Sequence, residues 1–567
     1  MKSSKLFTLI LPQLMVLMVL IAVSSTLYGA DKAPNIVFLL ADDLGPGDVG
    51  SYHRRFAGTE AKVATPHMDR LAKEGMSFSD AQLPAALCAP NRFSILTGNY
   101  TFRSIPWGSW FSTGHPALTY GPNAGDRAKN PHQTVGGLLQ KVGYRTAFIG
   151  KMHLGGDYFD KQGNLLRNIE KGEQGQNLEE IDFSRPFKNG LREHGFDYTF
   201  VSPCGIQGPL YAYFENDKYR AISDFADHVA GLSVASPSKW KHFPKRSKMG
   251  HSYAERKGYG DSEYDSSEHG PILTHFAEEF IRKHCKEHPD KPFLLYYASP
   301  SIHTPHSPSR EGIVAHGSTK LGVRADSVSD FDMQVGRILS VCDELGITND
   351  TLFILTSDNG GVLTNAQPMI KAGQHPIGPY RGNKELVWEG GRRVPMIWKW
   401  GDGSAKSKIP SGVVCDQLVS VMDWVMSIAH LTGQTPASDQ HQDSTSLWPL
   451  LSSSDPNKEA AIRKSHYFQG EDRKKRERRG IRVDIGDCQW VYILPQKDAP
   501  QELYDLRQDI GEKNNHLKGL YGPEAIPAEH PQADLVKQLI KAFQQCNNFK
   551  DPRSMPLQDF KGTQAVK

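Results

Sequence analysis

The sequence is poor in cysteine and nearly balanced in charge, and each of these features excludes a class of protein. Its 567 residues contain seven cysteines, with no CxxC pair and no metal-binding spacing among them. A disulfide-rich scaffold and a cysteine-ligated zinc centre are therefore excluded. The 66 Lys and Arg residues and the 63 Asp and Glu residues leave a net charge of +3. This balance indicates no nucleic-acid partner, which would need a concentrated basic stripe.

Long hydrophobic runs are also scarce, and the one that stands out lies at the N-terminus. The segment MKSSK supplies positive charge, an apolar run follows over 14–23, and small residues lead up to Ala30. Pro12 and Gln13 leave this run shorter than the ~20 residues of a spanning helix. We expect residues 1–30 to be a cleaved signal peptide, with an uncleaved anchor as the alternative. The mature chain is then exported, to a periplasm, the cell exterior or a secretory lumen, without stable insertion into a membrane.

Export permits disulfides, but an odd number of cysteines leaves at least one thiol without a partner in the chain. We expect that thiol to be Cys88. The other six could pair or lie buried: Cys204, Cys285, Cys342, Cys415, Cys488 and Cys546.

Several short apolar runs are typical of strands that are buried on both faces of a parallel sheet. They span residues 35–41, 144–150, 292–298 and 351–356. A helix is expected over 328–346, with Cys342 on its apolar face. Strands that alternate with helices predict an α/β domain with a doubly wound, mostly parallel sheet.

The pattern changes after about residue 455, where short strands separated by polar turns are expected. Four strands are predicted within 465–506, and an amphipathic helix over 534–546. We therefore predict a large α/β domain over 31–455 and a smaller α+β subdomain over 456–567, with an antiparallel sheet and a helix. The basic run EDRKKRERRG, 471–480, is expected to lie between two strands. It is either a solvated hairpin loop or a loop that contacts an anion near the functional site.

Polar side chains follow each of the four predicted parallel strands. In chain order they are Asp42 with Asp43, Lys151 with His153, His303 with His306, and Asp358 with Asn359. Because ligands bind at the carboxyl ends of the strands in open α/β sheets, we expect one convergent site.

The composition of this site indicates its chemistry. Asp42, Asp43, Asp358 and Asn359 offer hard oxygen ligands, which suit Ca²⁺ or Mg²⁺ rather than Zn²⁺. A set of cationic or neutral basic groups accompanies them, and together with a metal they describe a pocket for a compact tetrahedral anion. The set comprises Arg92, Lys151, His153, His303 and Lys384.

Residues 88–92, CAPNR, with Leu96-Thr97-Gly98 after them, resemble the C-x-P-x-R signature of type I sulfatases, in the alkaline phosphatase-like superfamily. In that family a maturation enzyme oxidises the cysteine to formylglycine. Asn91 departs from the serine or small residue usual at its position. Further segments resemble the family in the same order along the chain: 35–52, 65–81, 150–155, 351–360, 381–395 and 502–515.

The resemblance implies a metal site and a nucleophile. Asp42, Asp43, Asp358 and Asn359 would bind one divalent ion, most often Ca²⁺ in this family, with Mg²⁺ as the alternative. The formylglycine made from Cys88 would complete the ion's shell and hydrate to a gem-diol, one hydroxyl of which would attack sulfur. A plain thiolate fits less well, because the acidic ligands nearby would raise its pKa.

The resemblance also implies roles for the surrounding groups. Arg92 would hold the diol and its turn, and His153 would accept a proton from the second hydroxyl, so that sulfate leaves. Lys151, His303 and Lys384 would bind the sulfate oxygens. His303 or Lys384 would assist the departing alcohol, with His303 preferred to His306.

The substrate is harder to predict. A segment close after the nucleophile, 101–121, could stack on sugar rings or could be a packed surface loop; its aromatic and histidine residues are Trp107, Trp110, Phe111, His115 and Tyr120. The loop 363–380, with Gln374, His375 and Tyr380, is a second candidate wall. We expect a sulfated carbohydrate, small or polymeric. The alternatives are a phosphate or phosphonate monoester hydrolase and a non-catalytic protein that binds sulfated glycans.

Overall fold

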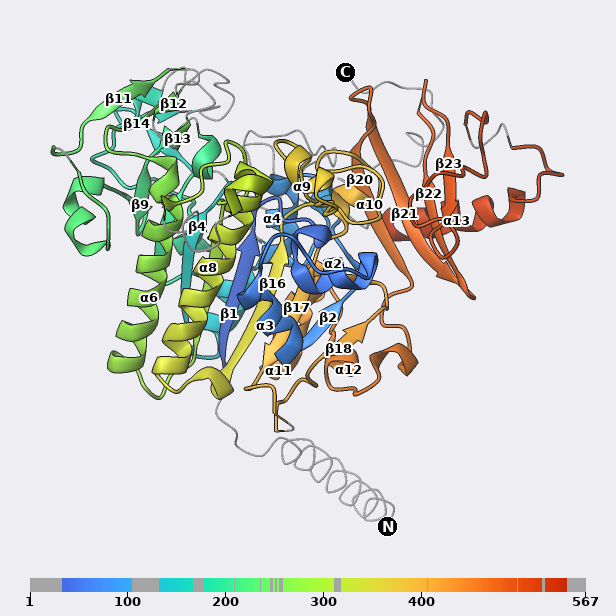
Figure 1. Ribbon diagram of the computed structural model, residues 1–567, viewed down its shortest axis with the longest axis horizontal. Helices are drawn as coiled ribbons and strands as arrows, with labels where there is room; N and C mark the ends of the chain where they lie inside the picture. The colour runs from blue at the N-terminus through green and yellow to red at the C-terminus, as the bar shows by residue number, and fades with distance from the viewer. Residues whose placement is uncertain are drawn as a thin grey trace, which may run out of the picture. The chain divides into compact units, whose positions relative to one another are not determined.

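Ten strands form the central sheet of the computed structural model (Figure 1), in the order β10-β9-β7-β4-β15-β1-β16-β17-β2-β18. The five neighbours from β7 to β16 run parallel to one another. The sheet turns antiparallel beyond them, at β9 and at β17. The strands are β1 (Asn35–Ala41), β2 (Met76–Phe78), β4 (Arg145–Lys151), β7 (Tyr198–Ser202), β9 (Tyr213–Glu215), β10 (Lys218–Arg220), β15 (Phe293–Ser299), β16 (Thr351–Ser357), β17 (Met396–Trp400) and β18 (Val413–Cys415).

The structure describes residues 33–103, 132–310, 318–522 and 526–547, with short gaps at 155, 167–177, 209, 235, 245–247, 250–251, 254–257, 405 and 497. The predicted signal peptide and the aromatic residues between 107 and 120 lie outside the described residues. The chain from Asn35 onward forms one compact unit. A domain boundary at residue 455 therefore stays a prediction.

All four predicted parallel strands are confirmed, within one residue at each end, as β1, β4, β15 and β16. Alternate side chains of β1 enter opposite core clusters, Ile36 and Phe38 on one face and Val37 and Leu39 on the other. Helices cover both faces, as a doubly wound sheet requires. One face carries α3 (Pro66–Glu74), α6 (His269–Glu287) and α8 (Val323–Glu344), and the other α4 (Cys88–Thr97), α5 (Val135–Gln140) and α11 (Trp424–Leu431).

Helix α8 begins five residues before the predicted start at Val328. Its first turns bury the polar side chains of Arg324 and Ser327, so the apolar period could not mark its beginning. Cys342 lies in the core, as predicted, and its thiol is free. Within the described residues, no helix combines the length and the apolar character that crossing a bilayer requires.

The C-terminal part forms a second, antiparallel sheet, as predicted. Helix α13 (Ala533–Asn547) packs on it through Leu539 and Phe543. The predicted loop over 471–480 is wrong in extent, because Glu471 ends one strand and Glu477 begins the next. Arg478 is buried and donates to the carbonyl oxygen of Pro500, so this charged residue belongs to a strand. The strands are β20 (Ser465–Glu471), β21 (Glu477–Ile485), β22 (Cys488–Ile493) and β23 (Glu502–Asp505).

Strand β20 contacts two segments that precede it in the chain. The amide of Ala86 donates to the carbonyl oxygen of Gln469 at 3.0 Å. Farther along β20, the amide of Val387 donates to the carbonyl oxygen of Glu471 at 2.8 Å. The second sheet therefore lies beside the segment that precedes Cys88 and the segment that follows Lys384.

Candidate active site

Four of the predicted ligands follow two adjacent strands, β1 and β16. Ala41 and Ser357 end these strands in register, so the chain brings Asp42 and Asp43 beside Asp358 and Asn359. The amide of Asp358 donates to the carbonyl oxygen of Ala41, which fixes the two turns against each other. All four side chains are fully buried. The predicted convergence of these residues is present in the fold.

Three oxygen atoms of this group lack a hydrogen-bond partner among the described residues. They are Oδ1 of Asp42, Oδ2 of Asp43 and Oδ1 of Asn359. Ligand atoms of Asp42, Asp358 and Cys88 lie within 4.8 Å of one another. Because a buried oxygen without a donor costs free energy, such a set is expected to hold a cation. Carboxylate and amide oxygens are the ligands that Ca²⁺ and Mg²⁺ prefer, so the donor set fits either ion.

The charges around the carboxylates differ enough to separate their pKa values. Burial alone would raise the pKa of Asp42, but Lys151, His303 and Arg92 together hold it well below its usual value. Burial and the neighbouring Asp42 raise the pKa of Asp358 to about 7, although Arg92 opposes the shift. The cations of the site therefore stabilise the ionised form of Asp42 much more than that of Asp358.

Cys88 begins helix α4 and faces this cluster. Its side chain is 3% exposed, and its Sγ lies 3.3 Å from Nδ1 of His153. Burial is the main reason why the pKa of its thiol is raised, and the charges of Asp42 and Asp358 add to the shift. The sequence predicted this direction from the acidic neighbours, whereas desolvation is the larger cause. At neutral pH the unmodified thiol is protonated and a weak nucleophile.

The helix turn after Cys88 is tied to the same strands. Nε of Arg92 donates to Oδ2 of Asp358 at 2.8 Å, and Nη1 donates to the carbonyl oxygen of Lys151 at 2.7 Å. Asn91, which departs from the family pattern, accepts from the amide of Ala85 at 2.9 Å and donates to the carbonyl oxygen of Asp358 at 2.7 Å. Its longer side chain therefore joins the nucleophile's helix to the end of β16.

Lys151 and His153 follow β4 into the site. Nζ of Lys151 lies 2.5 Å from Oδ2 of Asp42, and both side chains are fully buried. His153 has a positive φ of 51°, which is uncommon for a residue other than glycine, and its ring contacts Cys88. Burial lowers the pKa of His153 well below its usual value, and the charges of Lys151 and Arg92 lower it further. His153 is therefore a neutral base at physiological pH.

Lys384 and His303 lie where the site approaches the surface. Nζ of Lys384 lies 2.6 Å from Oδ1 of Asp43, with 10% of the side chain exposed. Nε2 of His303 lies 3.8 Å from Oδ2 of Asp43. Burial and Lys384 lower the pKa of His303 to about 4, so the ring is neutral and forms no ion pair there at pH 7. His306 instead contacts Asn365 at 3.1 Å.

Two residues beneath the site escaped the sequence analysis. Nη2 of Arg324 lies 2.5 Å from Oδ2 of Asp48 and 3.2 Å from the carbonyl oxygen of Asp43. This buried pair supports the turn that presents Asp43, whose φ of 73° is unusual for a residue other than glycine. Asp48 ends the segment GPGD, 45–48, close after the two aspartates, and this proximity could have identified it. Arg324 lies 276 residues away from Asp48, and no local pattern in the sequence identifies it.

Two of the three side chains that the sequence suggested for a wall in the loop 363–380 are buried, and a wall formed by the rest of the loop, with the half-buried His375, stays a prediction. Gln374 is fully buried and accepts from the amides of Lys62 and Val63. The Tyr380 ring is also buried and packs edge-on against Phe56. Both side chains hold neighbouring loops together, because buried amide and hydroxyl groups need internal partners.

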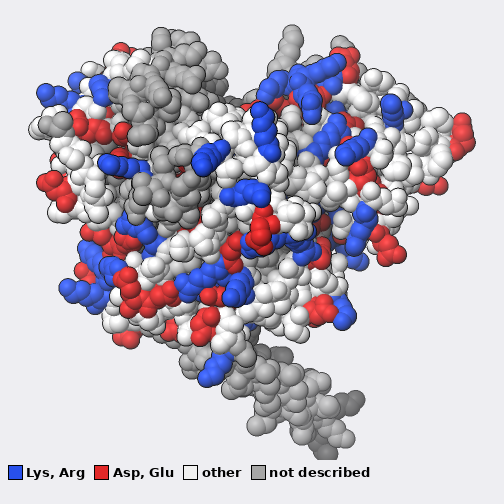
Figure 2. Space-filling model, viewed as in Figure 1, with Lys and Arg blue, Asp and Glu red and all other residues white. Residues whose placement is uncertain are grey.

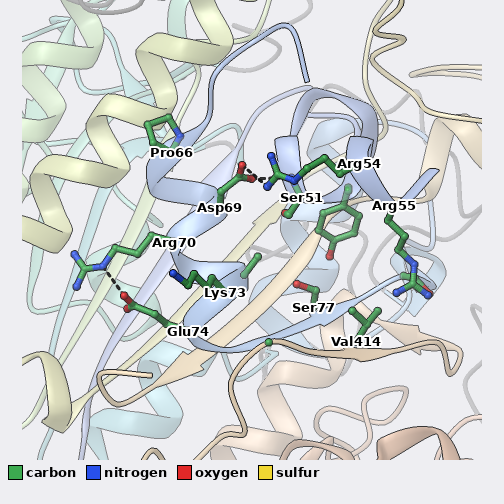
Figure 3. A pocket seen from close by; sticks show the side chains of 14 residues that line it. Ser51, Arg54, Arg55, Pro66, Asp69, Arg70, Lys73, Glu74, Ser77 and Val414 are labelled. Atoms are coloured by element: carbon green, nitrogen blue, oxygen red, sulfur yellow. Dashed lines mark hydrogen bonds and ion pairs between the residues drawn. The ribbon is translucent and has the colours of Figure 1, made fainter. Parts of the chain in front are cut away.

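A separate cavity of about 720 Å³ lies between α2 (Gly50–Ala57), α3 and strands β2 and β18 (Figure 3). None of the residues described above lines it. Two of its cations face acidic partners in the lining, Arg54 with Asp69 at 2.8 Å and Arg70 with Glu74 at 3.0 Å. Arg55 and Lys73 line the cavity as well, but it contains no cysteine, histidine or paired carboxylates of the kind gathered at the candidate site.

Comparisons with known proteins agree with the site. A family model described as Sulfatase matches residues 34–434. The chain is 29% identical over 522 residues to an N-acetylgalactosamine-6-O-sulfatase of Bacteroides thetaiotaomicron, which covers 86% of this chain and 90% of that protein. It is 31% identical over 437 residues to the N-acetylgalactosamine-6-sulfatase of Sus scrofa, and the match covers 77% of this chain and 69% of that protein.

Solved structures show the same fold. One comes from work on the metabolism of multiple glycosaminoglycans by Bacteroides thetaiotaomicron. It matches with a TM-score of 0.67 and 26% identity, and the match covers 91% of this chain and 99% of that chain. Another is Ps i-CgsB in complex with k-i-k-neocarrahexaose, with a TM-score of 0.61 and 22% identity. The match covers 94% of this chain and 100% of that chain, and at this identity it shows the fold alone. The chain therefore belongs to the sulfatase family and is a sulfuric ester hydrolase.

Proposed function

We propose that this sulfatase removes sulfate from a sulfated carbohydrate, with a formylglycine made from Cys88 as the reactive residue and one Ca²⁺ ion beside it. The observation that carries the proposal is the position of Cys88. Its Sγ lies 3.3 Å from a neutral histidine nitrogen, next to carboxylates with unpaired oxygens and three buried cations.

Asp42, Asp43, Asp358 and Asn359 would hold the cation, with residue 88 completing the shell. Three of these four side chains carry the unpaired oxygens, which supports the assignment. When bound, the ion supplies fixed positive charge next to the nucleophile and the sulfate group. Mg²⁺ fits the same donors and is the second choice.

His153 is the base of the proposed reaction. The hydrated aldehyde of residue 88 supplies one hydroxyl for attack on sulfur and a second hydroxyl that must lose its proton before sulfate leaves. Nδ1 of His153 faces residue 88, so this nitrogen is the acceptor and Nε2 carries the ring proton. Its lowered pKa keeps it unprotonated and available at neutral pH.

Lys151 and Lys384 would bind the sulfate oxygens, Arg92 would keep residue 88 in place, and His303 would lie beside them. Nδ1 of His303 lies 2.5 Å from the carbonyl oxygen of Thr304, so it carries the proton of the neutral ring and leaves Nε2 as an acceptor. The ammonium of Lys384 keeps its protons: burial alone would lower its pKa, but Asp43 and the other negative groups of the site together raise it. Lys384 is therefore the group that donates a hydrogen bond to the departing oxygen.

The proposed substrate is an N-acetylgalactosamine that carries a 6-sulfate, alone or within a longer chain. The first relatives reported above are named for that reaction, which supports the choice. The C-x-P-x-R core supports a maturation enzyme as a partner, and the N-terminal run 1–30 supports export by a cleaved signal peptide.

Hydrolysis assays on protein made with a formylglycine-generating enzyme test the proposal. We expect sulfate release from N-acetylgalactosamine 6-sulfate and none from the same concentration of Cys88→Ala. Phenyl sulfate and phenyl phosphate form a matched pair that separates the two ester classes. Faster turnover of the phosphate, or equal activity of the Cys88→Ala chain, would overturn the proposal.

A further inference from the structure

The turn between β20 and β21 is the most basic feature near the active site. Residues 473–476 are Arg-Lys-Lys-Arg, and Figure 2 shows Lys and Arg side chains gathered at the upper edge of the molecule, where Figure 1 places the ends of β20 and β21. We infer that Arg473 and Lys474 bind a second anionic group, sulfate or carboxylate, of a polyanionic glycan whose scissile sulfate lies at residue 88. This inference rests on the proposed function and names the substrate class more narrowly.

Position is the first argument, because β20 leads from the nucleophile to this turn. Gln469 pairs with the backbone at Ala86, two residues before Cys88. Two residues later, the amide of Glu471 donates to the carbonyl oxygen of Glu385 at 2.7 Å. Glu385 directly follows Lys384, and neighbouring Cα atoms lie about 3.8 Å apart. The basic turn therefore begins beside the segment that carries Lys384, the most exposed of the site's three cations.

The charge balance of the turn is the second argument. Lys475 lies 2.6 Å from Glu385 and 3.0 Å from Glu471, so its charge is already shared. Arg476 is paired with Asp472 in the same way. Arg473 and Lys474 are exposed, and within the described part of the chain they form no ion pair. They carry the charge of this turn that is free to meet a ligand.

The third argument is the rigidity of the turn. Oδ1 of Asp472 accepts from the amides of Lys474 and Arg476, at 2.8 and 3.2 Å. The amide of Asp472 donates to the carbonyl oxygen of Arg476 at 2.9 Å, which closes the hairpin. Because the backbone is fixed in advance, less entropy is lost when the two side chains bind. A guanidinium also matches the two oxygens of a sulfate or carboxylate.

Three substrates with the same terminal sulfated sugar test the inference. One carries a neutral flanking sugar, one a flanking carboxylate and one a flanking sulfate. We expect the full, converted chain with Arg473→Ser and Lys474→Ser to lose about tenfold in kcat/KM on the anionic substrates, mainly through KM. The neutral substrate should be hydrolysed as by the wild type. Added salt should lower the preference of the wild type and leave the variant unaffected.

The matched control removes two exposed lysines from α6, Lys283→Ser and Lys286→Ser. They lie near the amino end of β15, and the seven residues of β15 place them ~20 Å from the site edge. Equal losses in this control and in the turn variant, equal losses on all three substrates, or no loss at all would overturn the inference. If the wild type releases no sulfate from any of the three, the proposed function fails instead.

Discussion

Two buried clusters of charge contain the same kinds of side chain, yet they differ in how their oxygens are satisfied. One is the site cluster of Asp42, Asp43, Asp358 and Asn359. The other, the junction cluster, lies between the large domain and the second sheet; it consists of Asp80, Gln82, Glu389, Arg392, Arg393, Arg482 and Glu512.

In the junction cluster, the carboxylates meet guanidinium groups from the chain itself. Arg393 lies 2.9 Å from Oδ1 of Asp80, and Arg482 lies 3.2 Å from Oδ2 of the same side chain. Both oxygens of Glu389 are paired, with Arg392 and Arg393. Counted by hydrogen bonds among the described residues, the site cluster leaves three oxygens without a partner. The junction cluster leaves two, Oε1 of Glu389, which has an ion pair with Arg392, and Oε1 of Glu512. The junction carboxylates of Asp80 and Glu389 are therefore held by arginines of the chain, whereas the site oxygens have fewer internal partners, which fits the cation proposed for them.

The largest expected effect separates catalysis from stability. His153→Ala should lower kcat by about 10²–10⁴, because a positioned base contributes that much to proton transfer. The midpoint of thermal unfolding should stay close to that of the wild type, since His153 touches the cluster without closing a charge pair. Steady-state kinetics and calorimetry on the same preparation provide the check. A lower midpoint of thermal unfolding together with an unchanged kcat would show that His153 serves stability and not catalysis, and would contradict the distinction between the clusters.

Arg392→Met should show the opposite pattern. This substitution leaves Glu389 with one fewer cation and removes the guanidinium that stacks 3.7 Å from the Phe468 ring. Breaking a buried pair costs about 3–5 kcal/mol of unfolding free energy. Denaturant titration measures that loss, and the active fraction should retain the kcat of the wild type. Arg55→Met, which breaks a pair between exposed side chains, is the control and should cost less than about 1 kcal/mol.

Removing the cation should affect only the site cluster. Chelation should lower the free energy of unfolding, by about 2.7 kcal/mol relative to protein with calcium at a hundred times its dissociation constant. Asp43→Asn should lose most of this calcium dependence, while Arg392→Met should retain all of it. Thermal melts with and without calcium measure the effect without relying on activity. Identical melts of the wild type in both conditions would contradict the assignment of the unpaired oxygens to a metal.

The smallest effect, measured per pH unit, concerns the junction cluster. Burial and the neighbouring Glu389 raise the pKa of Glu512 to about 8. The folded state therefore keeps a proton that the unfolded state loses near its ordinary pKa of about 4.5, so this group's stabilisation falls as pH rises from about 4.5 to 8. The difference in unfolding free energy between the wild type and Glu512→Gln should decrease by about 1.4 kcal/mol per pH unit in that range. If the difference in unfolding free energy stays constant with pH, the pKa of Glu512 is not raised in the folded state.

The sequence predicted the strands and helices that have a regular pattern of apolar residues, and the polar residues that directly follow those strands. The apolar run 35–41 and the two aspartates after it are adjacent, so strand and ligands could be identified together. The residues C-x-P-x-R likewise stand within one helical turn. Pairs such as Arg324 with Asp48 and Arg392 with Gln82 depend on contacts across hundreds of residues, and no period marks them. The charges of the run 471–480 predict an exposed loop, because the sequence does not show which of these side chains are buried. In the structure Arg478 is buried and the last four residues of the run belong to β21.

The most direct test of the central claim is to measure the rate of sulfate release as a function of the state of residue 88. Preparations made with increasing amounts of the maturation enzyme can be digested, and mass spectrometry of the peptide containing residues 87–92 gives the fraction that carries aldehyde instead of thiol. The account predicts that kcat rises in proportion to that fraction and vanishes with it. Full activity in a preparation whose residue 88 is entirely unmodified cysteine would contradict it.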